Sequence, residues 1–418
     1  MRFHHRLAAL AVLAGFLSES SLAQQRKLLV ISVDGMDTRY LKDADRLGLK
    51  IPTLRRLMAE GTTAQGVVGI VPTVTWPSHT TIISGVPSEE HGILTNDQPG
   101  QPGQRWWFTS FLKAPTLWKI AHDKGLKTAT VYWPVTVGAT VDFNFPEFWV
   151  KRSEHEIEFA PIAERSTPGL LDKVAKVYPK FKRDLWDDEA GILAVRYLLE
   201  FERPDLTLVH IADLDSEAHE KGAFTAAAHK VLENQDRLIG QALEKLPAGT
   251  IVAVVSDHGF ENIDKVVRPN AMLKAASLPA EAVVSNGLIG VKDARAAAHF
   301  RTLAGKPSSV IAREVPMAEV RKMAPMLKDW IAAFEPSAGH VAAAAQDGAP
   351  ISEGNHTGTH GLWPTRANYR ASFLLWGPGV KRGKLGEVSM LELGPTFAEI
   401  LGLPLPGAKM ASLWPKLH

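Results

Sequence analysis

The threonine hydroxyl at position 75 stands in a context suited to phosphate chemistry. Pro77 suits the first turn of a helix, and the run after it closes on Gly85, as helix ends often do. Thr75 is therefore expected at a helix N-terminus, where unpaired backbone N–H groups favour an anion such as phosphate. A threonine hydroxyl is a weak nucleophile, and no base adjoins it in the sequence, so it needs a metal ion or a distant base. The same residues are typical of a turn with a helix cap, and this stretch alone leaves that alternative open.

Six carboxylate and imidazole residues have spacings suited to metal ligation. They are Asp34, Asp215, His219, Asp257, His258 and His360. Asp215 and His219 are four residues apart, so on a helical turn both can face one ion. The chain has no cysteine, and a set made of Asp and His suits zinc. Two such ions about 4 Å apart could clamp the attacking and leaving oxygens of an in-line phosphoryl displacement.

Other histidines compete with this set or have structural explanations. His356 lies close to His360 and is a rival ligand, but Gly361 follows His360 and allows a tight approach. His79 is expected to be structural or to support a ligand, and His91 to satisfy a turn. Each Asp/His pair also occurs often by chance, so the metal hypothesis depends on all the pieces meeting in the fold.

The elements that must bring these residues together alternate along the chain. Short apolar runs at 27–33, 127–133, 206–211, 251–255 and 371–376 predict strands, and 53–60, 116–123, 188–200, 225–246 and 393–401 predict helices. This order predicts an α/β fold with a mostly parallel central sheet and helices on both faces. Asp34, Asp215 and Asp257 each follow a strand, and ligands bind beyond the carboxyl ends of such strands. The three carboxylates are therefore expected on one rim.

Two regions depart from this alternation. Residues 135–187 have weak periodicity and are expected to form loops and short helices over one face of the core. From about 262 to 348 the pattern changes again, with a hairpin expected at 282–291 around Asn286-Gly287 and a helix at 317–334 kinked at Pro325. We interpret residues 262–348 as a cap inserted into a catalytic domain that spans 24–418.

Composition and the N-terminus bear on location and partners. The chain has 418 residues and a formal net charge of +2, which gives no reason to expect a nucleic-acid polymer or an anionic membrane as partner. Arg2 and Arg6, the apolar run 7–17 and the small-residue site ending at Ala23 predict a signal peptide over 1–23. The protein is then periplasmic or secreted and has no membrane span after cleavage. An uncleaved N-terminal anchor is the alternative.

Motifs spread over most of the chain resemble the alkaline phosphatase superfamily, and most closely its nucleotide pyrophosphatase/phosphodiesterase family. The matching stretches are Val33-Asp34-Gly35, Pro72 to His79, His91-Gly92-Ile93 with Asn96, Asp215-x-x-x-His219, Ser256-Asp257-His258-Gly259 and Thr359-His360-Gly361. The segments 373–379 and 395–403 resemble the closing strand and helix of that family. The resemblance implies a hydrolase of phosphate diesters or pyrophosphates that acts on a small nucleotide or other phosphodiester.

The resemblance also implies a role for each matching residue. Two Zn2+ ions are implied, one held by Asp215, His219 and His360. The other is held by Asp34, Asp257 and His258, and it also contacts Thr75 as the activated nucleophile of a covalent phosphothreonine. Asn96 is implied to bind a phosphate oxygen together with the backbone N–H that follows the nucleophile, and Trp76 to stand beside the nucleobase or leaving-group pocket.

Departures from the family pattern lie near the expected walls of the site. Ser78 replaces the usual Asn, Ala218 a Gly, and Leu362-Trp363 an aromatic-acidic pair, so these departures bear on the substrate more than on the chemistry. Nucleotides, dinucleotides and phospholipid head groups all remain open as substrates. A phosphomonoesterase is the alternative enzyme, ranked lower because the sequence shows no evident Arg clamp for a dianionic phosphoryl group. A sulfatase is disfavoured by threonine at position 75, and a zinc-binding protein without turnover is a further alternative.

Overall fold

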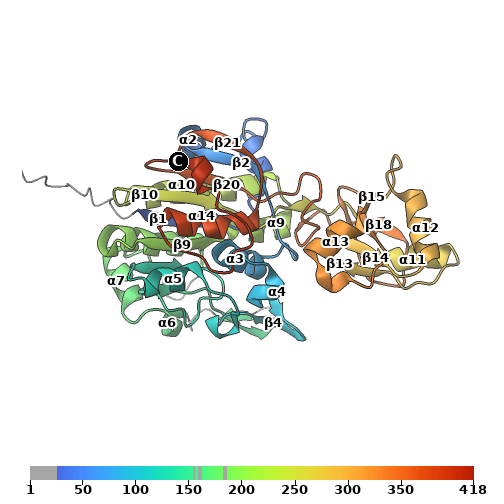
Figure 1. Ribbon diagram of the computed structural model, residues 1–418, viewed down its shortest axis with the longest axis horizontal. Helices are drawn as coiled ribbons and strands as arrows, with labels where there is room; N and C mark the ends of the chain where they lie inside the picture. Colours follow the sequence, from blue (N-terminus) through green and yellow to red (C-terminus); the bar gives the residue numbers. More distant parts are fainter. Residues whose placement is uncertain (1–25, 154–155, 159–161, 182–185) are drawn as a thin grey trace, which may run out of the picture.

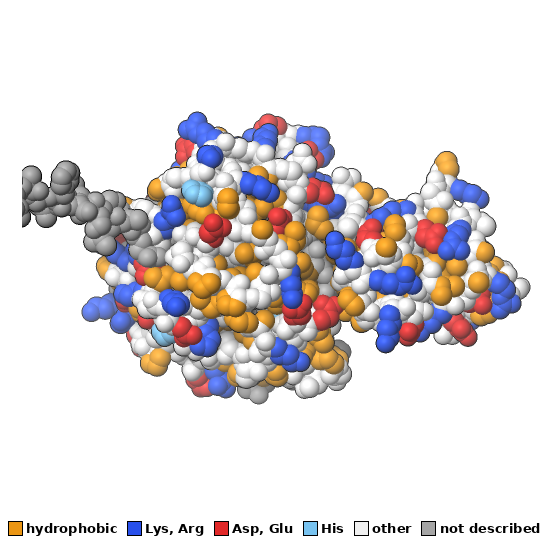
Figure 2. Space-filling view, viewed as in Figure 1, with side chains coloured by type: hydrophobic (Ala, Val, Ile, Leu, Met, Phe, Trp, Pro, Cys, Tyr) orange, Lys and Arg blue, Asp and Glu red, His pale blue; other side chains and the backbone are white. Residues whose placement is uncertain are grey.

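The computed structural model describes residues 26–153, 156–158, 162–181 and 186–418. The expected signal peptide over 1–23 lies outside the described residues. Figure 1 shows a large lobe, built around one sheet, and a small lobe that projects from it and is formed by the segment coloured yellow to orange. Figure 2 shows basic and acidic side chains interspersed over both lobes on the face in view. Within the described part of the chain, no helix has both the length and the apolar character needed to cross a membrane.

A sheet of eight strands forms the centre of the large lobe. In spatial order the strands are β21 (Gly383–Ser389), β2 (Thr62–Val68), β20 (Phe373–Trp376), β10 (Thr250–Val255), β1 (Lys27–Val33), β9 (Leu206–Ile211), β5 (Thr128–Val131) and β6 (Phe143–Phe145). Among these described strands only β20 runs against its neighbours, and every other pair is parallel. The predicted mostly parallel sheet is confirmed.

Strand β1 shows why helices must cover both faces of this sheet. Its side chains alternate, so that Leu29 and Ile31 join one apolar layer while Leu28 and Val30 join the other. Both layers are buried, and helices cover each of them (Figure 1). The first layer receives α2 (Pro52–Glu60), α8 (Asp188–Tyr197) and α10 (Ala226–Leu243), and the second receives α3 (Thr75–Ser84), α5 (Leu117–Asp123) and α14 (Leu393–Ile400).

Local sequence explains where several of these helices begin and end. The side chain of Thr225 accepts a hydrogen bond from the backbone N–H of Ala228 and caps α10, and Asp187 caps α8 in the same way. Gly85 ends α3 with a φ of 68°, in the left-handed region where glycine is favoured. The expected helix from Thr75 to this glycine is therefore confirmed.

The small lobe contains two further sheets. One has the order β13 (Val283–Ser285), β14 (Leu288–Val291), β16 (Ala332–Pro336) and β15 (Ile311–Val315), and the other has the order β17 (His340–Ala342), β12 (Lys265–Val267) and β18 (Ile351–Glu353). Helices α11 (Pro269–Ala275), α12 (Ala294–Leu303) and α13 (Met317–Met323) belong to the same lobe (Figure 1). The predicted hairpin is confirmed, with positive φ at both Asn286 and Gly287 as a two-residue turn requires.

The predicted helix over 317–334 is wrong in its second half. Helix α13 ends at Met323, a short 3-10 turn covers Pro325–Leu327, and the chain then enters β16. Strand β16 pairs with β14 on one side and β15 on the other, so it is an inner strand of its sheet. Pairing with the strands β14 and β15 determines the conformation of β16, because its residues Ala, Phe and Glu are by themselves compatible with a helix.

Some strands of the central sheet are not predicted by the sequence. The sequence predicts loops and short helices over 135–187, but β6 lies in this region and pairs with β5. The edge strand β21 and its neighbour β2 were not predicted either. Both contain glycine and exposed polar residues, so neither shows the continuous apolar run of a buried strand.

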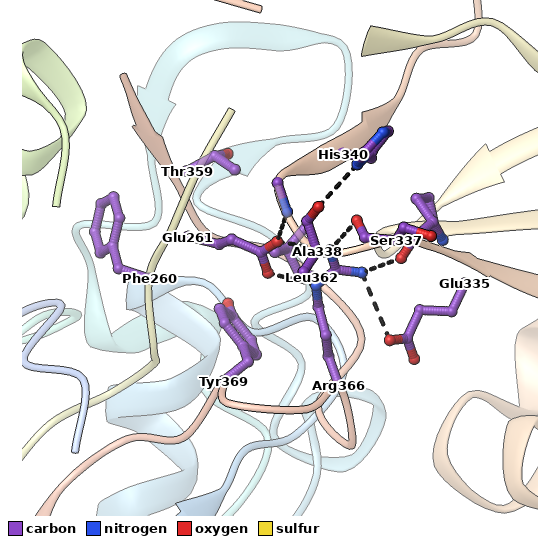
Figure 3. Close-up of polar contacts among 12 residues, drawn as sticks. Phe260, Glu261, Glu335, Ser337, Ala338, His340, Thr359, Leu362, Arg366 and Tyr369 are labelled. Atoms are coloured by element: carbon purple, nitrogen blue, oxygen red, sulfur yellow. Dashed lines mark hydrogen bonds and ion pairs between the residues drawn. The ribbon is translucent and has the colours of Figure 1, made fainter. Parts of the chain in front are cut away.

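A buried arginine ties the small lobe to the large one (Figure 3). The guanidinium of Arg366 donates two hydrogen bonds to the carboxylate of Glu261, at 2.5 and 2.7 Å. It also donates to the backbone carbonyls of Pro336 and Ser337, at 2.6 and 2.8 Å, and lies 3.5 Å from Glu335. Glu261 in turn accepts a hydrogen bond from the backbone N–H of Gly339. The junction therefore consists of charge-assisted hydrogen bonds that depend on one another.

Replacing Arg366 with Met is expected to lower the free energy of unfolding by about 3–5 kcal/mol, because the change leaves the largely buried carboxylate of Glu261 without its partner. Urea unfolding followed by circular dichroism measures this loss. Arg301→Met is the matched control, since its pair with Glu314 lies at the surface and is worth about 0–1 kcal/mol. Equal, small losses in the two variants would contradict the central role of Arg366.

Candidate active site

The carboxyl edge of the central sheet collects the predicted site residues. Asp34 follows β1 directly, and Asp257 and His258 follow β10. Asp215 and His219 lie on α9 (Asp213–Lys221), which begins just after β9. His360 follows β19 (Gly358–Thr359), which pairs with β11 (Glu261–Asn262) a few residues beyond His258. The six residues meet although they come from four separate segments of the chain.

Two groups of three side chains are arranged around points that could hold a cation. In the first group, Nε2 of His258 lies 3.3 Å from Oδ1 of Asp34 and 3.1 Å from Oδ2 of Asp257, and all three residues are buried. In the second group, Oδ1 of Asp215 lies 3.6 Å from Nε2 of His219 and 3.7 Å from Nε2 of His360. Within each group the candidate ligand atoms lie within 4.8 Å of one another.

The two groups adjoin each other. The rings of His258 and His360 stack with centroids 3.8 Å apart, and Nε2 of His258 is 3.9 Å from Oδ1 of Asp215. This stacking places the two groups side by side, because His258 belongs to the first group and His360 to the second. The described residues therefore include two adjacent groups of candidate ligands.

The donor atoms fit the zinc ions that the sequence implies. Ligands about 2.0–2.1 Å from a tetrahedral zinc ion stand about 3.3 Å from one another, which is close to the separations in both groups. Several of these atoms are buried and have no hydrogen-bond partner among the described residues. They are Oδ1 of Asp34, Oδ1 of Asp215, Oδ2 of Asp257 and Nε2 of His258. Buried polar atoms are rarely left without a partner, so their convergence supports a bound cation.

Protonation equilibria at the site also favour a cation. Burial, reinforced by the charges of Asp257 and Asp215, raises the pKa of Asp34 well above its usual range. Burial and Asp257 likewise raise the pKa of Asp215 to about 8. Burial lowers the pKa of His258 to about 3, which keeps this imidazole neutral and able to act as a ligand. Carboxylates that repel one another in a buried cluster are stabilised in their charged forms by a positive ion.

Thr75 lies at the first residue of α3, and its side chain is among the groups that line a cavity of about 260 Å³. Asp34, Asp215, His219 and His360 line the same cavity. Among the described residues, the Thr75 hydroxyl has no hydrogen-bond partner. The predicted nucleophile and members of both groups of candidate ligands therefore line one cavity.

Asn96 and Trp76 also line this cavity, but they contact each other in a way the sequence did not predict. The backbone N–H of Trp76 donates to Oδ1 of Asn96 at 3.1 Å. The first backbone donor after Thr75 is thus engaged by the Asn96 side chain, because an unpaired N–H at a helix start binds a nearby carbonyl oxygen. The amide NH2 of Asn96 remains as the donor that can reach a phosphate oxygen.

The loop before α3 is fastened to the segment that carries His360. The backbone carbonyl of Thr73 lies 3.2 Å from Nδ1 of His360 and accepts the N–H of Gly361 at 3.0 Å. The Tyr369 hydroxyl donates to Oγ1 of Thr73 at 3.0 Å and accepts the N–H of Gly361 at 3.1 Å. These contacts orient the imidazole of His360 and fix its distance from the Thr75 helix.

The other histidines occupy the places expected of structural residues. His79 is buried on α3 with Nδ1 2.9 Å from the carbonyl of Thr75 and 3.7 Å from Asp257. His91 is buried, lies 3.1 Å from the hydroxyl of Thr81, and accepts the backbone N–H of Ile93. His356 is exposed near Asp264 and belongs to neither group of candidate ligands. The structure therefore favours His360 over its rival.

Several residues that line the cavity are not predicted as site residues by the sequence. They are Arg105, Glu147, Trp149, Trp186 and His210. Nε2 of His210 lies 2.9 Å from Asp34, and its Nδ1 lies 3.6 Å from Glu147. Burial alone would lower the pKa of His210, but these two carboxylates outweigh burial and raise it well above its usual value. One signal was available in the sequence, since a histidine in the otherwise apolar run of β9 is unusual in a buried strand.

Comparison with known proteins identifies the family of this chain. The family model described as "Type I phosphodiesterase / nucleotide pyrophosphatase" matches residues 28–363. A venom phosphodiesterase of Naja atra is 26% identical over 260 residues, which is 57% of this chain and 27% of that protein. Ectonucleotide pyrophosphatase/phosphodiesterase family member 1 of Mus musculus is 24% identical over 426 residues, covering 90% of this chain and 41% of the mouse protein.

These curated relatives are much longer than this chain, which spans about a quarter of the venom enzyme's length (27%). A solved structure of murine ectonucleotide pyrophosphatase/phosphodiesterase 5, an inactive variant in complex with AMP, superposes with a TM-score of 0.61 at 17% identity. The match covers 94% of this chain and 100% of the murine one, and at this identity it establishes the shared fold. With the family model matched over most of its length, the chain belongs to the type I phosphodiesterase / nucleotide pyrophosphatase family.

Proposed function

We propose that this protein hydrolyses phosphate diesters or pyrophosphates through a covalent phosphothreonine on Thr75, with two bound Zn2+ ions. The observation that carries the proposal is one cavity that is lined by Thr75, at a helix start, and by members of both groups of candidate ligands. By this proposal one ion binds Asp215, His219 and His360. The other binds Asp34, Asp257 and His258 and contacts Thr75.

The chain's own residues supply attack, alignment and binding. Oγ1 of Thr75 attacks phosphorus while the bond from phosphorus to the leaving oxygen breaks, which gives a phosphothreonine ester and a free leaving group. Water then attacks the same phosphorus, releases the product phosphate monoester and restores the Thr75 hydroxyl. The bound ions would lower the pKa of this hydroxyl and stabilise the charge on the phosphoryl oxygens. The amide of Asn96 donates to one of those oxygens, and Trp76 packs against the nucleobase or leaving group.

The proposal extends to substrate and location. The size of the cavity and its tryptophans suit a nucleotide or another small phosphodiester, and a nucleic-acid polymer is not expected. We propose export to the periplasm or the cell exterior, on the basis of the N-terminal sequence that precedes Gln24. We also propose that 24–418 forms one catalytic unit in which the insertion at about 262–348 acts as a cap.

A phosphomonoesterase remains the second candidate, and one observation favours it. Arg105 lines the cavity, whereas the sequence alone shows no evident arginine that could clamp a phosphoryl group. A cation at this place could stabilise the extra charge of a monoester. The two candidates differ in which substrate is hydrolysed faster.

The rates of bis(p-nitrophenyl) phosphate and p-nitrophenyl phosphate hydrolysis separate the two candidates. We expect kcat/KM to favour the diester by at least about tenfold, which corresponds to about 1.4 kcal/mol of transition-state stabilisation. Release of p-nitrophenol, followed by absorbance with the zinc-loaded protein, gives both values. The opposite preference would support the phosphomonoesterase, and turnover of neither ester would support a zinc-binding protein without catalysis.

A further inference from the structure

We propose that Arg105 forms an anion subsite that binds a second phosphate group of the substrate, beyond the phosphoryl group attacked by Thr75. The inference rests on the proposed function and adds to it a residue that distinguishes nucleotides whose leaving group is itself a phosphate or pyrophosphate from other phosphodiesters. Three features of the residue carry it: its place in the cavity, its unused donors and its stacking.

The place of Arg105 is set by a short hairpin that follows Asn96. Strand β3 (Asp97–Gln98) pairs with β4 (Gln101–Arg105), and Arg105 is the last residue of β4. Nη1 of Arg105 donates to Oδ1 of Asp97 at 2.8 Å, which anchors the side chain across the hairpin. Because Asp97 is the neighbour of Asn96 in sequence, the guanidinium is held beside the residue that is expected to contact the scissile phosphoryl group.

Most of the hydrogen-bonding capacity of Arg105 is unused. A guanidinium has five N–H donors, and among the described residues Asp97 is the only hydrogen-bond acceptor of the Arg105 side chain. Nε of Arg105 is buried and has no hydrogen-bond partner in the part of the chain that the structure describes. Arg366 differs, since its donors bind a carboxylate in bidentate fashion and two backbone carbonyls. Arg366 is satisfied within the protein, whereas Arg105 presents donors to the cavity.

Stacking on two tryptophan rings holds the Arg105 guanidinium in place. It also indicates whether a ligand that binds there is a cation or an anion. Its guanidinium carbon lies 5.0 Å from the centre of the Trp76 ring and 5.6 Å from that of Trp149. The two indoles that could have bound a cationic ligand are thus already in contact with a cation of the protein. The carboxylate of Glu147, which also lines the cavity, is paired with His210. A ligand group that enters beside Arg105 is therefore expected to be anionic, and a planar fork of N–H groups suits phosphate oxygens.

Two nucleotide substrates with the same nucleoside test the subsite. Thymidine 5′-monophosphate p-nitrophenyl ester and thymidine triphosphate share the scissile phosphoryl group, but only the second has further phosphates. In Arg105→Gln, kcat/KM for the triphosphate is expected to fall at least about tenfold more than kcat/KM for the aryl ester, since bonds to a charged group are lost. Arg105→Lys keeps the charge and is expected to recover part of the difference.

Arg165→Gln is the matched control, because this exposed arginine also stacks on aromatic rings, those of Phe148 and Phe108, but does not line the cavity. It is expected to leave the ratio of the two rates unchanged. Equal losses for both substrates in Arg105→Gln, or no loss for either, would overturn the proposal. A loss confined to p-nitrophenyl phosphate would also overturn it and would assign Arg105 to the scissile phosphoryl group of a monoester.

A binding measurement separates this proposal from the proposed function. Calorimetry with the zinc-loaded Thr75→Ala protein, which is not expected to hydrolyse either ligand, compares thymidine diphosphate with thymidine monophosphate. The gain in affinity from the second phosphate is expected to be about tenfold or more in Thr75→Ala and to disappear when Arg105→Gln is added to it. If the unmutated protein hydrolyses neither nucleotide substrate while Thr75→Ala shows this gain, the catalytic proposal is refuted and the subsite is kept. Absence of the gain in Thr75→Ala would refute the subsite alone.

Discussion

Replacing Thr75 with alanine is expected to reduce kcat for a diester by several powers of ten while the protein still folds and binds zinc. The reason is that the attacking oxygen is removed, and each tenfold loss of rate corresponds to about 1.4 kcal/mol of barrier. The three side chains of the neighbouring group, Asp34, Asp257 and His258, remain in place to hold an ion. Steady-state rates, zinc content and circular dichroism measure the three parts of this prediction.

Two further variants make the result specific. Thr75→Ser keeps a hydroxyl at the same helix start and is expected to retain part of the rate. Ser84→Ala, on the same helix, removes a buried hydroxyl that has no hydrogen-bond partner among the described residues, and it should leave the rate close to that of the unmutated protein. If Thr75 serves only as a helix residue, alanine should change both stability and activity little, because Val74 is the N-cap of α3 and no side-chain cap hydrogen bond forms there. Retention of more than about a tenth of the rate would refute the nucleophile assignment.

Removal of the metal ions is expected to abolish hydrolysis, and zinc is expected to restore it. Asp257→Asn should lower kcat by several orders of magnitude, because one of the three ligands of a buried ion loses its charge. The same change should leave the thermal stability of the metal-free protein equal or higher. The reason is that Asp257 repels Asp34 and Asp215 and helps to raise the pKa of each. Added zinc should then raise Tm of the unmutated protein much more than that of Asp257→Asn.

Elemental analysis and differential scanning calorimetry test this second prediction, with two zinc ions per chain as the expected content. Asp264→Asn is a suitable control, because that carboxylate lies at the surface beside His356 and outside both groups. Full activity in excess chelator, with no zinc bound, would sink the two-metal mechanism. A Tm of the metal-free Asp257→Asn protein far below that of the metal-free unmutated protein would show that the carboxylate stabilises the fold by other contacts.

Most of the candidate ligands could be predicted from sequence because they are tied to local signals, whereas His360 was preferred to His356 because Gly361 follows it and because of the family resemblance. Asp34 and Asp257 follow apolar strands, and Asp215 and His219 are spaced for one face of a helix. Each signal needs only a few consecutive residues, and a parallel sheet brings strand ends to one edge. Whether these side chains bind zinc stays a prediction, but their convergence needed no knowledge of the tertiary structure.

The walls of the cavity could not be predicted in this way. Arg105 comes from a hairpin of mostly exposed polar residues, and Glu147 from the loop after the unpredicted edge strand β6. Their positions depend on pairing between distant segments, which leaves no periodic pattern in the sequence. The same cause explains the error in β16, whose conformation is imposed by two neighbouring strands. Residues that set substrate preference are therefore the least accessible to sequence reasoning in this protein.

The pairing of β11 with β19 has a consequence for how this protein can change over time. The two strands bring Asn262 opposite Gly358, so the whole small lobe leaves and re-enters the large lobe at one point, between the segments that carry His258 and His360. The entropic cost of closing a loop rises by only about 0.6 kcal/mol for each doubling of its length. Insertions and deletions between these strands thus have a small effect on the meeting of the two histidines. Selection can enlarge, shrink or replace the lobe while the ligand geometry is inherited unchanged.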